Sequence, residues 1–259
     1  MNQAHKPYFT LLALSLIALL ASGLFIPCQT CVAETDVAKP SAEMPAFVDG
    51  NRILFQGDSI TDGNRGRSAD PNHILGHGYQ FIIAAKYGGH LPERHLTFLN
   101  RGVSGNTVAD LAKRWDKDTL ALKPDILSIL IGVNDLNRNV PIDQYEQGYD
   151  QLLKDTIKAL PNVRLVICEP FGLPVGGKKA NWGEYRSNLA KYQAIAAKLA
   201  DRYHVPFVRF QKVFDDACQR APADYWIWDG VHPTYNGHQL MADEWERTME
   251  HVQPAKPNP

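Results

Sequence analysis

Between residues 46 and 252 the chain alternates short apolar runs with longer amphipathic runs. This alternation is typical of β-strands joined by helical crossovers, which build a parallel sheet covered by helices. We expect five strands, at residues 53–56, 97–100, 126–131, 164–168 and 206–208. We expect helices near residues 79–87, 107–115, 144–160, 185–203 and 237–251. The pattern therefore predicts one α/β domain over residues 46–252.

The composition supports one domain and argues against some classes of partner. A chain of 259 residues with 44% hydrophobic residues can bury one full core. Its 27 Lys+Arg and 28 Asp+Glu give a formal net charge of −1, with no long run of one sign. Nucleic acid is therefore not an expected partner. We expect a neutral or mildly charged small molecule as the ligand, and the sequence leaves the oligomeric state open.

The first 33 residues have the pattern of a signal peptide. Lys6 supplies the positive start, residues 11–26 are apolar, and small residues lie around residues 31–33. The apolar stretch is just short of the roughly 18 to 20 residues that a membrane span needs. We therefore expect cleavage, a secreted or periplasmic location and no stable membrane insertion, with a retained anchor as the alternative. A lipid anchor at Cys28 is disfavoured, because no small residue directly precedes it.

Two flanking segments and two cysteines complete the domain organisation. Residues 34–45 are polar and lack apolar periodicity, so we expect a flexible lead-in, and we expect residues 253–259 to form a disordered tail. Cys168 and Cys218 remain after signal cleavage, and an oxidising compartment would permit a disulfide between them. The sequence does not establish the Cα separation that a disulfide requires, so two separate buried thiols are the favoured interpretation.

Three polar, glycine-bearing turns follow the first three expected strands. They comprise residues 57–59, 102–106 and 132–135. In an open parallel sheet, ligands bind in the crevice outside the carboxyl ends of the strands. We therefore expect these turns to converge on one site.

Ser59, in the first of these turns, is the candidate nucleophile. A serine hydroxyl attacks a carbonyl only when a base takes its proton and donors stabilise the oxyanion. His232 is the candidate base, and Asp229 could hold the second ring nitrogen across one tight turn. Oxyanion donors could be the backbone N–H groups of Ser59 and Gly105 and the side-chain amide of Asn134. Each residue alone more often caps a helix or stabilises a turn, so their joint occurrence is what indicates a hydrolase.

These blocks resemble those of the GDSL or SGNH hydrolases, a family named for short motifs that carry Ser, Gly, Asn and His. Residues 57–61, 100–107, 132–135 and 229–232 match the four blocks in the family's order. The resemblance implies a three-layer α/β/α sandwich with a five-stranded parallel sheet, the flavodoxin-like SGNH hydrolase fold. It also implies no cofactor and no metal. The site residues that it implies are the nucleophile Ser59, the oxyanion donors Ser59, Gly105 and Asn134, the base His232 and its orienter Asp229.

Two details depart from the simplest family pattern. Ile60 replaces the leucine of the family name, and we expect it to be a buried support beneath the nucleophile turn. Gly102 competes with Gly105 for the second-block role. Gly105 is preferred because the family's second-block glycine follows a small residue and precedes a polar residue and a threonine, as in residues 104–107 here. Gly105 would also allow close backbone approach, because it has no Cβ.

Sequence motifs agree with the absence of a metal or a nucleotide cofactor. The chain has no His-Glu-x-x-His, no paired C-x-x-C set, no Walker loop and no G-x-G-x-x-G. A metal held by Asp58, Asp229 and His232 is the weaker alternative.

The substrate is less constrained than the chemistry, because specificity depends on surrounding loops. Residues 171–182 are glycine-bearing and could form a mobile rim, and three tryptophans could offer flat faces to sugar rings, although aromatic residues usually fill core. The tryptophans are Trp182, Trp226 and Trp228. A secreted esterase with tryptophans near its last block is similar to family members that deacetylate plant polysaccharides. We therefore predict a carboxylic ester hydrolase for short-chain, chiefly acetyl, esters of small molecules or polysaccharides. The alternatives are a lipolytic esterase or lysophospholipase, and a noncatalytic carbohydrate-binding protein.

Overall fold

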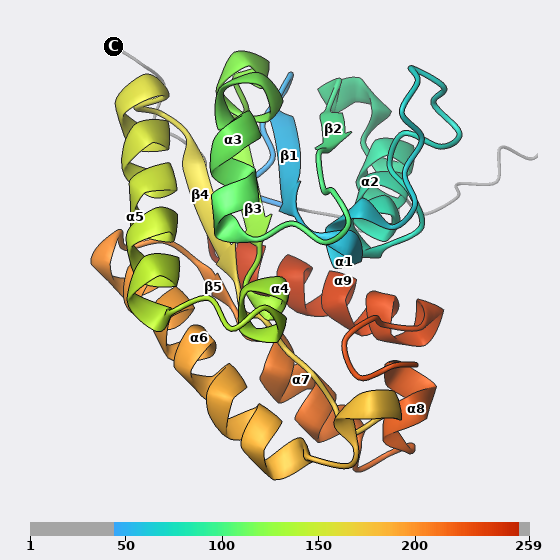
Figure 1. Ribbon diagram of the computed structural model, residues 1–259. Coiled ribbons are helices and arrows are strands. Elements are labelled where there is room, and N and C mark those ends of the chain that lie inside the picture. Colours follow the sequence, from blue (N-terminus) through green and yellow to red (C-terminus); the bar gives the residue numbers. More distant parts are fainter. Residues whose placement is uncertain (1–43, 254–259) are drawn as a thin grey trace, which may run out of the picture. The chain divides into compact units, whose positions relative to one another are not determined.

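The structure, a computed structural model, describes residues 44–253 (Figure 1). The expected signal peptide, residues 34–43 of the expected lead-in and residues 254–259 of the expected tail lie outside the described residues. Met44, expected in the flexible lead-in, is fully buried, as are Ala46 and Phe47. The packed domain therefore begins before residue 46. No helix within residues 44–253 is both long enough and apolar enough to cross a bilayer.

Five parallel strands form one sheet in the order β2-β1-β3-β4-β5. The strands are β1 (Arg52–Gly57), β2 (Thr97–Asn100), β3 (Ile126–Leu130), β4 (Arg164–Cys168) and β5 (Phe207–Val208). All five predicted strands are present, which confirms the predicted flavodoxin-like α/β fold. The strand order reverses between β1 and β3, and in such sheets the ligand crevice lies at this switch point.

Helices cover both faces of the sheet (Figure 1). The larger helices are α2 (Tyr79–His90), α3 (Val108–Asp118), α5 (Ile142–Ala159), α6 (Trp182–Arg202), α7 (Phe210–Ala217) and α9 (Tyr235–Met249). Successive strand residues point to opposite faces. Phe55 packs on Tyr79 of α2 and Trp245 of α9. The next residue, Gln56, donates to Thr119 Oγ1, just after α3, at 2.8 Å. The predicted three-layer sandwich is confirmed, and the five predicted helices are present with ends shifted by at most three residues.

Shorter elements connect this framework, and the sequence pattern did not predict them. They are α1 (Ser59–Asp62), α4 (Val133–Asn137), α8 (Ala223–Trp226), η1 (Pro92–Arg94), η2 (Leu120–Leu122) and η3 (Gly176–Lys178). Helices α1 and α4 begin directly behind β1 and β3, so they start at the carboxyl edge where the polar turns lie. Two of the three polar, glycine-bearing turns thus lead directly into short helices.

The segment expected to be a mobile rim is packed over its first half. Phe171 and Leu173 are buried, and Gly172 exchanges two hydrogen bonds with the side chain of Gln211, each 3.0 Å long. The prediction was wrong over this half of the segment, because the apolar side chains on either side of Gly172 are buried in the core.

Both described cysteines are free thiols. Cys168 is buried at the end of β4, and Cys218 is half-buried at the C-terminal end of α7. The interpretation as two separate thiols is confirmed, although only one of them is fully buried.

Candidate active site

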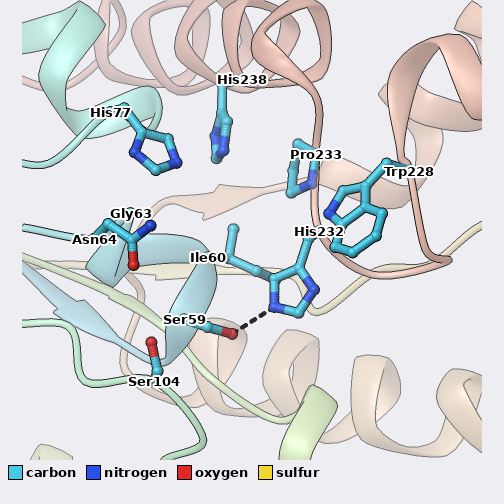
Figure 2. Close-up of a pocket in the computed structure, with 10 residues that line it drawn as sticks. All are labelled: Ser59, Ile60, Gly63, Asn64, His77, Ser104, Trp228, His232, Pro233 and His238. Carbon is cyan, nitrogen blue, oxygen red and sulfur yellow. Dashed lines mark hydrogen bonds between the residues drawn. The ribbon is translucent and has the colours of Figure 1, made fainter.

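Ser59 begins α1 directly after β1, and its position is set by the residues on either side. The carboxylate of Asp58 caps the helix by accepting the backbone N–H of Ile60 at 3.0 Å. Ile60 is buried, as expected for a support beneath this turn. The Ser59 hydroxyl lies 2.7 Å from Nε2 of His232 (Figure 2), within hydrogen-bond distance of a base that could take its proton.

Asp229 positions His232 through both its backbone and its ring. Asp229 Oδ1 accepts the backbone N–H groups of Val231 at 3.0 Å and His232 at 2.8 Å, while Oδ2 lies 2.7 Å from His232 Nδ1. Burial would raise the pKa of Asp229, but hydrogen bonds from His232 and Val231 hold it below its ordinary value. The carboxylate stays ionised, so Nδ1 carries a proton and Nε2 is free to accept one from Ser59.

The second polar turn is fastened to α1 by Asp62. Asp62 Oδ2 accepts both the backbone N–H and the hydroxyl of Ser104 at 3.0 Å, and Arg67 pairs with the same carboxylate at 2.7 Å. Burial would raise the pKa of Asp62, but the bonds from Arg67 and Ser104 hold it below its ordinary value. A buried, ionised carboxylate therefore joins the nucleophile helix to the turn that precedes Gly105.

Gly102 and Gly105 have different reasons to be glycine. A Cβ on Gly102 would lie 2.3 Å from the backbone nitrogen of Asp62, so Gly102 is the position where two backbones approach closely. Gly105 has a φ of +80°, whereas its missing Cβ would meet only the end of the Arg138 side chain. The reason expected for Gly105, close backbone approach, thus belongs to Gly102, and Gly105 is needed for its left-handed backbone.

Asn134 lies in α4, behind β3, and is tied to the Gly105 turn. Its Nδ2 donates to the carbonyl of Asn106 at 3.1 Å, and Arg138 of the same helix donates to the carbonyl of Gly105 at 2.7 Å. The Asn134 amide has a second hydrogen, which remains available for a ligand. The three polar turns are thus linked at the edge of the sheet, as the sequence predicted.

Two buried carboxyl groups lie under this site. Asp58 and Asp135 are each about 1% exposed, and each has one oxygen without a hydrogen-bond partner in the described part of the chain. Burial raises the pKa of Asp58 to about 7 and that of Asp135 to about 6. Asp135 also accepts the backbone N–H of Val108, the first residue of α3, at 3.1 Å. Both groups act as buried helix caps in this geometry.

The alternative metal site is not assembled. Both ring nitrogens of His232 contact protein atoms, and Asp58 is occupied as a helix cap. Over residues 44–253, no group of three or more His, Cys, Asp or Glu side chains is arranged to hold a metal ion.

A cavity of about 260 Å³ opens beside Ser59 (Figure 2). Most of its lining side chains are polar, and the lining residues are Ser59, Ile60, Gly63, Asn64, His77, Ser104, Trp228, His232, Pro233 and His238. Sequence reasoning missed Asn64, His77 and His238. Their signal in the sequence is only their nearness to the first and last blocks, since His238 comes six residues after His232.

The three tryptophans proposed as sugar platforms have separate environments. Trp228 is 65% exposed and lines the cavity, so its face is available to a ligand. Trp226 is buried, with its indole N–H donating to the carbonyl of Ala217 at 3.1 Å, and Trp182 is half-buried against Tyr185. Only Trp228 has the position that the sequence-based hypothesis requires.

A flavodoxin-like sheet that holds a serine, a histidine and an aspartate in one hydrogen-bonded line defines a serine-hydrolase architecture. The chain belongs to the GDSL-like lipase/acylhydrolase family, whose sequence model matches residues 55–240. It is a carboxylic ester hydrolase of the GDSL type.

Several relatives agree with this assignment. The chain is 31% identical to an acetylxylan esterase of Geobacillus stearothermophilus, over 74% of this chain and 91% of the relative. It is 26% identical to an isoamyl acetate-hydrolyzing esterase of Saccharomyces cerevisiae, over 80% of this chain and 89% of that protein. A solved GDSL-like lipase of Parabacteroides merdae superposes with a TM-score of 0.75 at 38% identity, over 80% of this chain and 99% of that one.

Proposed function

We propose that this protein hydrolyses short-chain acyl esters, chiefly acetyl esters, of carbohydrate alcohols, with Ser59 as nucleophile. The observation that carries the proposal is the line from Asp229 through His232 to Ser59, with two contacts of 2.7 Å, beside a cavity of about 260 Å³. This arrangement supplies a nucleophile, a base and an orienting carboxylate in reach of one another.

In the proposed reaction His232 Nε2 takes the proton of Ser59 while Oγ bonds to the ester carbonyl carbon. The tetrahedral intermediate then collapses, the carbon–oxygen bond to the alcohol breaks, and His232 returns the proton to the departing alkoxide. A water molecule then gives a proton to His232 and attacks the acyl-enzyme. The second collapse releases the carboxylic acid and restores the Ser59 hydroxyl.

The oxyanion of each intermediate requires fixed donors. We assign this role to the backbone N–H groups of Ser59 and Gly105 and to the second amide hydrogen of Asn134. The fixed geometry of their loops supports the assignment, because hydrogen bonds from Arg138 and Asn134 hold the second turn against α4. Donors fixed before the reaction need no reorganisation when the negative charge forms.

The cavity favours a polar alcohol and a short acyl group. Six of its lining side chains carry hydroxyl, amide or imidazole groups: Ser59, Asn64, His77, Ser104, His232 and His238. A lipolytic esterase needs a broad apolar channel for its acyl chain, and this cavity of about 260 Å³ does not provide one. The relatives named as acetylxylan esterases support the same choice.

A chain-length series tests this function. We would measure kcat/KM on p-nitrophenyl acetate, butyrate, octanoate and palmitate, and then acetate release from acetylated xylan. The proposal expects acetyl esters to be the best substrates and acetate to be released from the polysaccharide. A clear preference for octanoate or palmitate would replace it with the lipolytic alternative. Binding of acetylated xylan without acetate release would support the noncatalytic alternative.

Secretion is also part of the proposal, on the evidence of the apolar run after Lys6 and the small residues around Ala33. Amino-terminal sequencing of the protein from its native host tests it. A mature chain that begins near residue 34 is the expected result, and an intact first residue would contradict it.

A further inference from the structure

His238 is a buried histidine in the wall of the active-site cavity that the proposed mechanism does not use. It lies in the first turn of α9 and is only 5% exposed, yet its ring borders the cavity that contains Ser59 (Figure 2). Its Nδ1 accepts the backbone N–H of Tyr79, the first residue of α2, at 3.2 Å. His238 therefore belongs to α9, and its ring caps the N-terminus of α2.

This contact selects one tautomer of the neutral ring. A nitrogen that accepts an N–H bond carries no hydrogen, so the proton of neutral His238 must be on Nε2. Within residues 44–253 the His238 ring makes one hydrogen bond, the one from Tyr79, and its Nε2 is not among the fully enclosed atoms that lack a partner. The ring thus presents an N–H donor whose protein partner is missing, in a cavity open to ligand.

The ring also stays uncharged. Burial lowers the pKa of His238 to about 4, and the neighbouring rings of His77 and His232 act in the same direction. The His77 and His238 ring centres are 6.4 Å apart. A neutral donor will not repel the imidazolium that forms at His232 during turnover.

The position of His238 matches the alcohol part of an ester. His232 must return its proton to the departing alkoxide, so the alcohol lies on the His232 side of Ser59. Figure 2 shows Pro233 and Trp228 beside His232, with His238 and His77 farther along the cavity wall, and both His77 and His232 are near enough to act electrostatically on His238. The exposed ring of Trp228 lies 6.5 Å from that of His232, centre to centre, and offers a flat apolar surface at the same entrance.

We propose that His238 Nε2–H donates a hydrogen bond to an oxygen of the alcohol part, a hydroxyl or ring oxygen near the ester of a sugar, and so selects sugar esters over esters of simple alcohols and phenols. The inference rests on the proposed function and adds a specificity-determining residue to it. A site built to bond a substrate oxygen discriminates against an analogue that lacks this oxygen, because the donor then has no partner in the ligand.

Two substitutions separate the donor from the helix cap. In His238→Asn the side-chain oxygen can take the place of Nδ1 and accept the Tyr79 N–H, but no group replaces Nε2. In His238→Gln the amide nitrogen can reach the place of Nε2 and donate. We would measure kcat and KM on peracetylated xylopyranose and on p-nitrophenyl acetate. Each variant is then described by its selectivity ratio, the kcat/KM for the sugar ester divided by the kcat/KM for p-nitrophenyl acetate.

The expected result is a ratio about tenfold below wild type for His238→Asn, mainly through KM on the sugar ester, with part of the ratio restored in His238→Gln. An unchanged ratio in His238→Asn, including an equal loss on both substrates, would overturn the inference and leave the proposed function standing. Failure of the wild-type enzyme to hydrolyse the sugar acetate would overturn both. Urea unfolding of each variant checks that the ratio is measured on folded protein.

Discussion

Asp229 contacts His232 with both carboxylate oxygens, Oδ1 at the backbone N–H and Oδ2 at the ring. The two oxygens of this carboxylate have different roles. Oδ1 shapes the turn that follows β5 and α8, while Oδ2 selects the tautomer and orientation of the imidazole. Substitutions of Asp229 should therefore separate folding from catalysis.

We expect Asp229→Asn to retain the fold and lose activity. The amide oxygen can still accept the two backbone N–H groups, but the amide nitrogen would donate to Nδ1 and leave Nε2 protonated, unable to accept from Ser59. The expected loss in kcat is on the order of 10⁴-fold. Asp229→Ala should lose activity and also about 1 kcal/mol of unfolding free energy, because two backbone N–H groups lose their acceptor. Kinetics on p-nitrophenyl acetate with urea titrations distinguish the two; activity within tenfold of wild type in Asp229→Asn would contradict the assignment.

Ser59→Ala and His232→Ala should each lower kcat by roughly 10⁴-fold to 10⁶-fold. The kcat of the double variant should be no lower than that of the less active single variant, because the two residues act as a unit. Ser187→Ala, in the exposed part of α6, is the matched control and should keep the wild-type rate. Additive losses in a double-mutant cycle would show that Ser59 and His232 act independently.

The two glycines of the second turn should respond differently to alanine. Gly102→Ala places a methyl group 2.3 Å from a backbone nitrogen, so the chain must shift, at a cost of about 3 kcal/mol. Gly105→Ala meets only the strain of a φ of +80°, about 1 kcal/mol, but it moves a proposed oxyanion donor. Urea unfolding should rank Gly102→Ala as the less stable, and kcat per folded molecule should fall more in Gly105→Ala. The reverse order would contradict the separate roles of the two glycines.

The buried carboxyl of Asp58 should make stability depend on pH. Burial raises the pKa of Asp58 from an ordinary value of 3.8 to about 7, so between these pH values the folded chain holds a proton that the unfolded chain has released. The contribution of Asp58 to the unfolding free energy therefore falls as pH rises through this window, by at most about 1.4 kcal/mol per pH unit.

Asp58→Asn removes this titration while an amide oxygen can still cap α1. We would measure the unfolding free energies of wild type and variant from pH 4 to 8. The value for the variant minus the value for wild type should increase as pH rises. Asp135→Asn offers a matched comparison. Its effect on stability should be confined to a narrower pH range, since the pKa of Asp135 is raised only to about 6. Parallel stability curves for wild type and Asp58→Asn would contradict the raised pKa.

The strands and the four motif blocks could be predicted because each has a local physical cause. Strands buried on both faces favour near-continuous apolar runs, and every residue of β3 is buried, with Ser128 as its one polar member. The turns behind β1, β2 and β3 lie at one edge because parallel strands bring their carboxyl ends together.

Other features depend on contacts between distant segments and have no local signal. The need for glycine at position 102 comes from its approach to the backbone of Asp62, some forty residues earlier in the chain. His238 could equally have faced core or solvent, and its place in the cavity follows from how α9 packs against α2. Met44 belongs to the domain because its side chain is buried, although it stands in a segment without apolar periodicity.

Ser59 and His232 are 173 positions apart in the chain, and their contact joins the residue after β1 to the turn that precedes α9. Contacts between segments so far apart form slowly, because the entropy of closing a long loop must be offset first. Ester hydrolysis during refolding should therefore appear no sooner than the slowest phase of tryptophan fluorescence. A nascent chain still held in the ribosome by its final helix would carry every residue of the site and remain inactive.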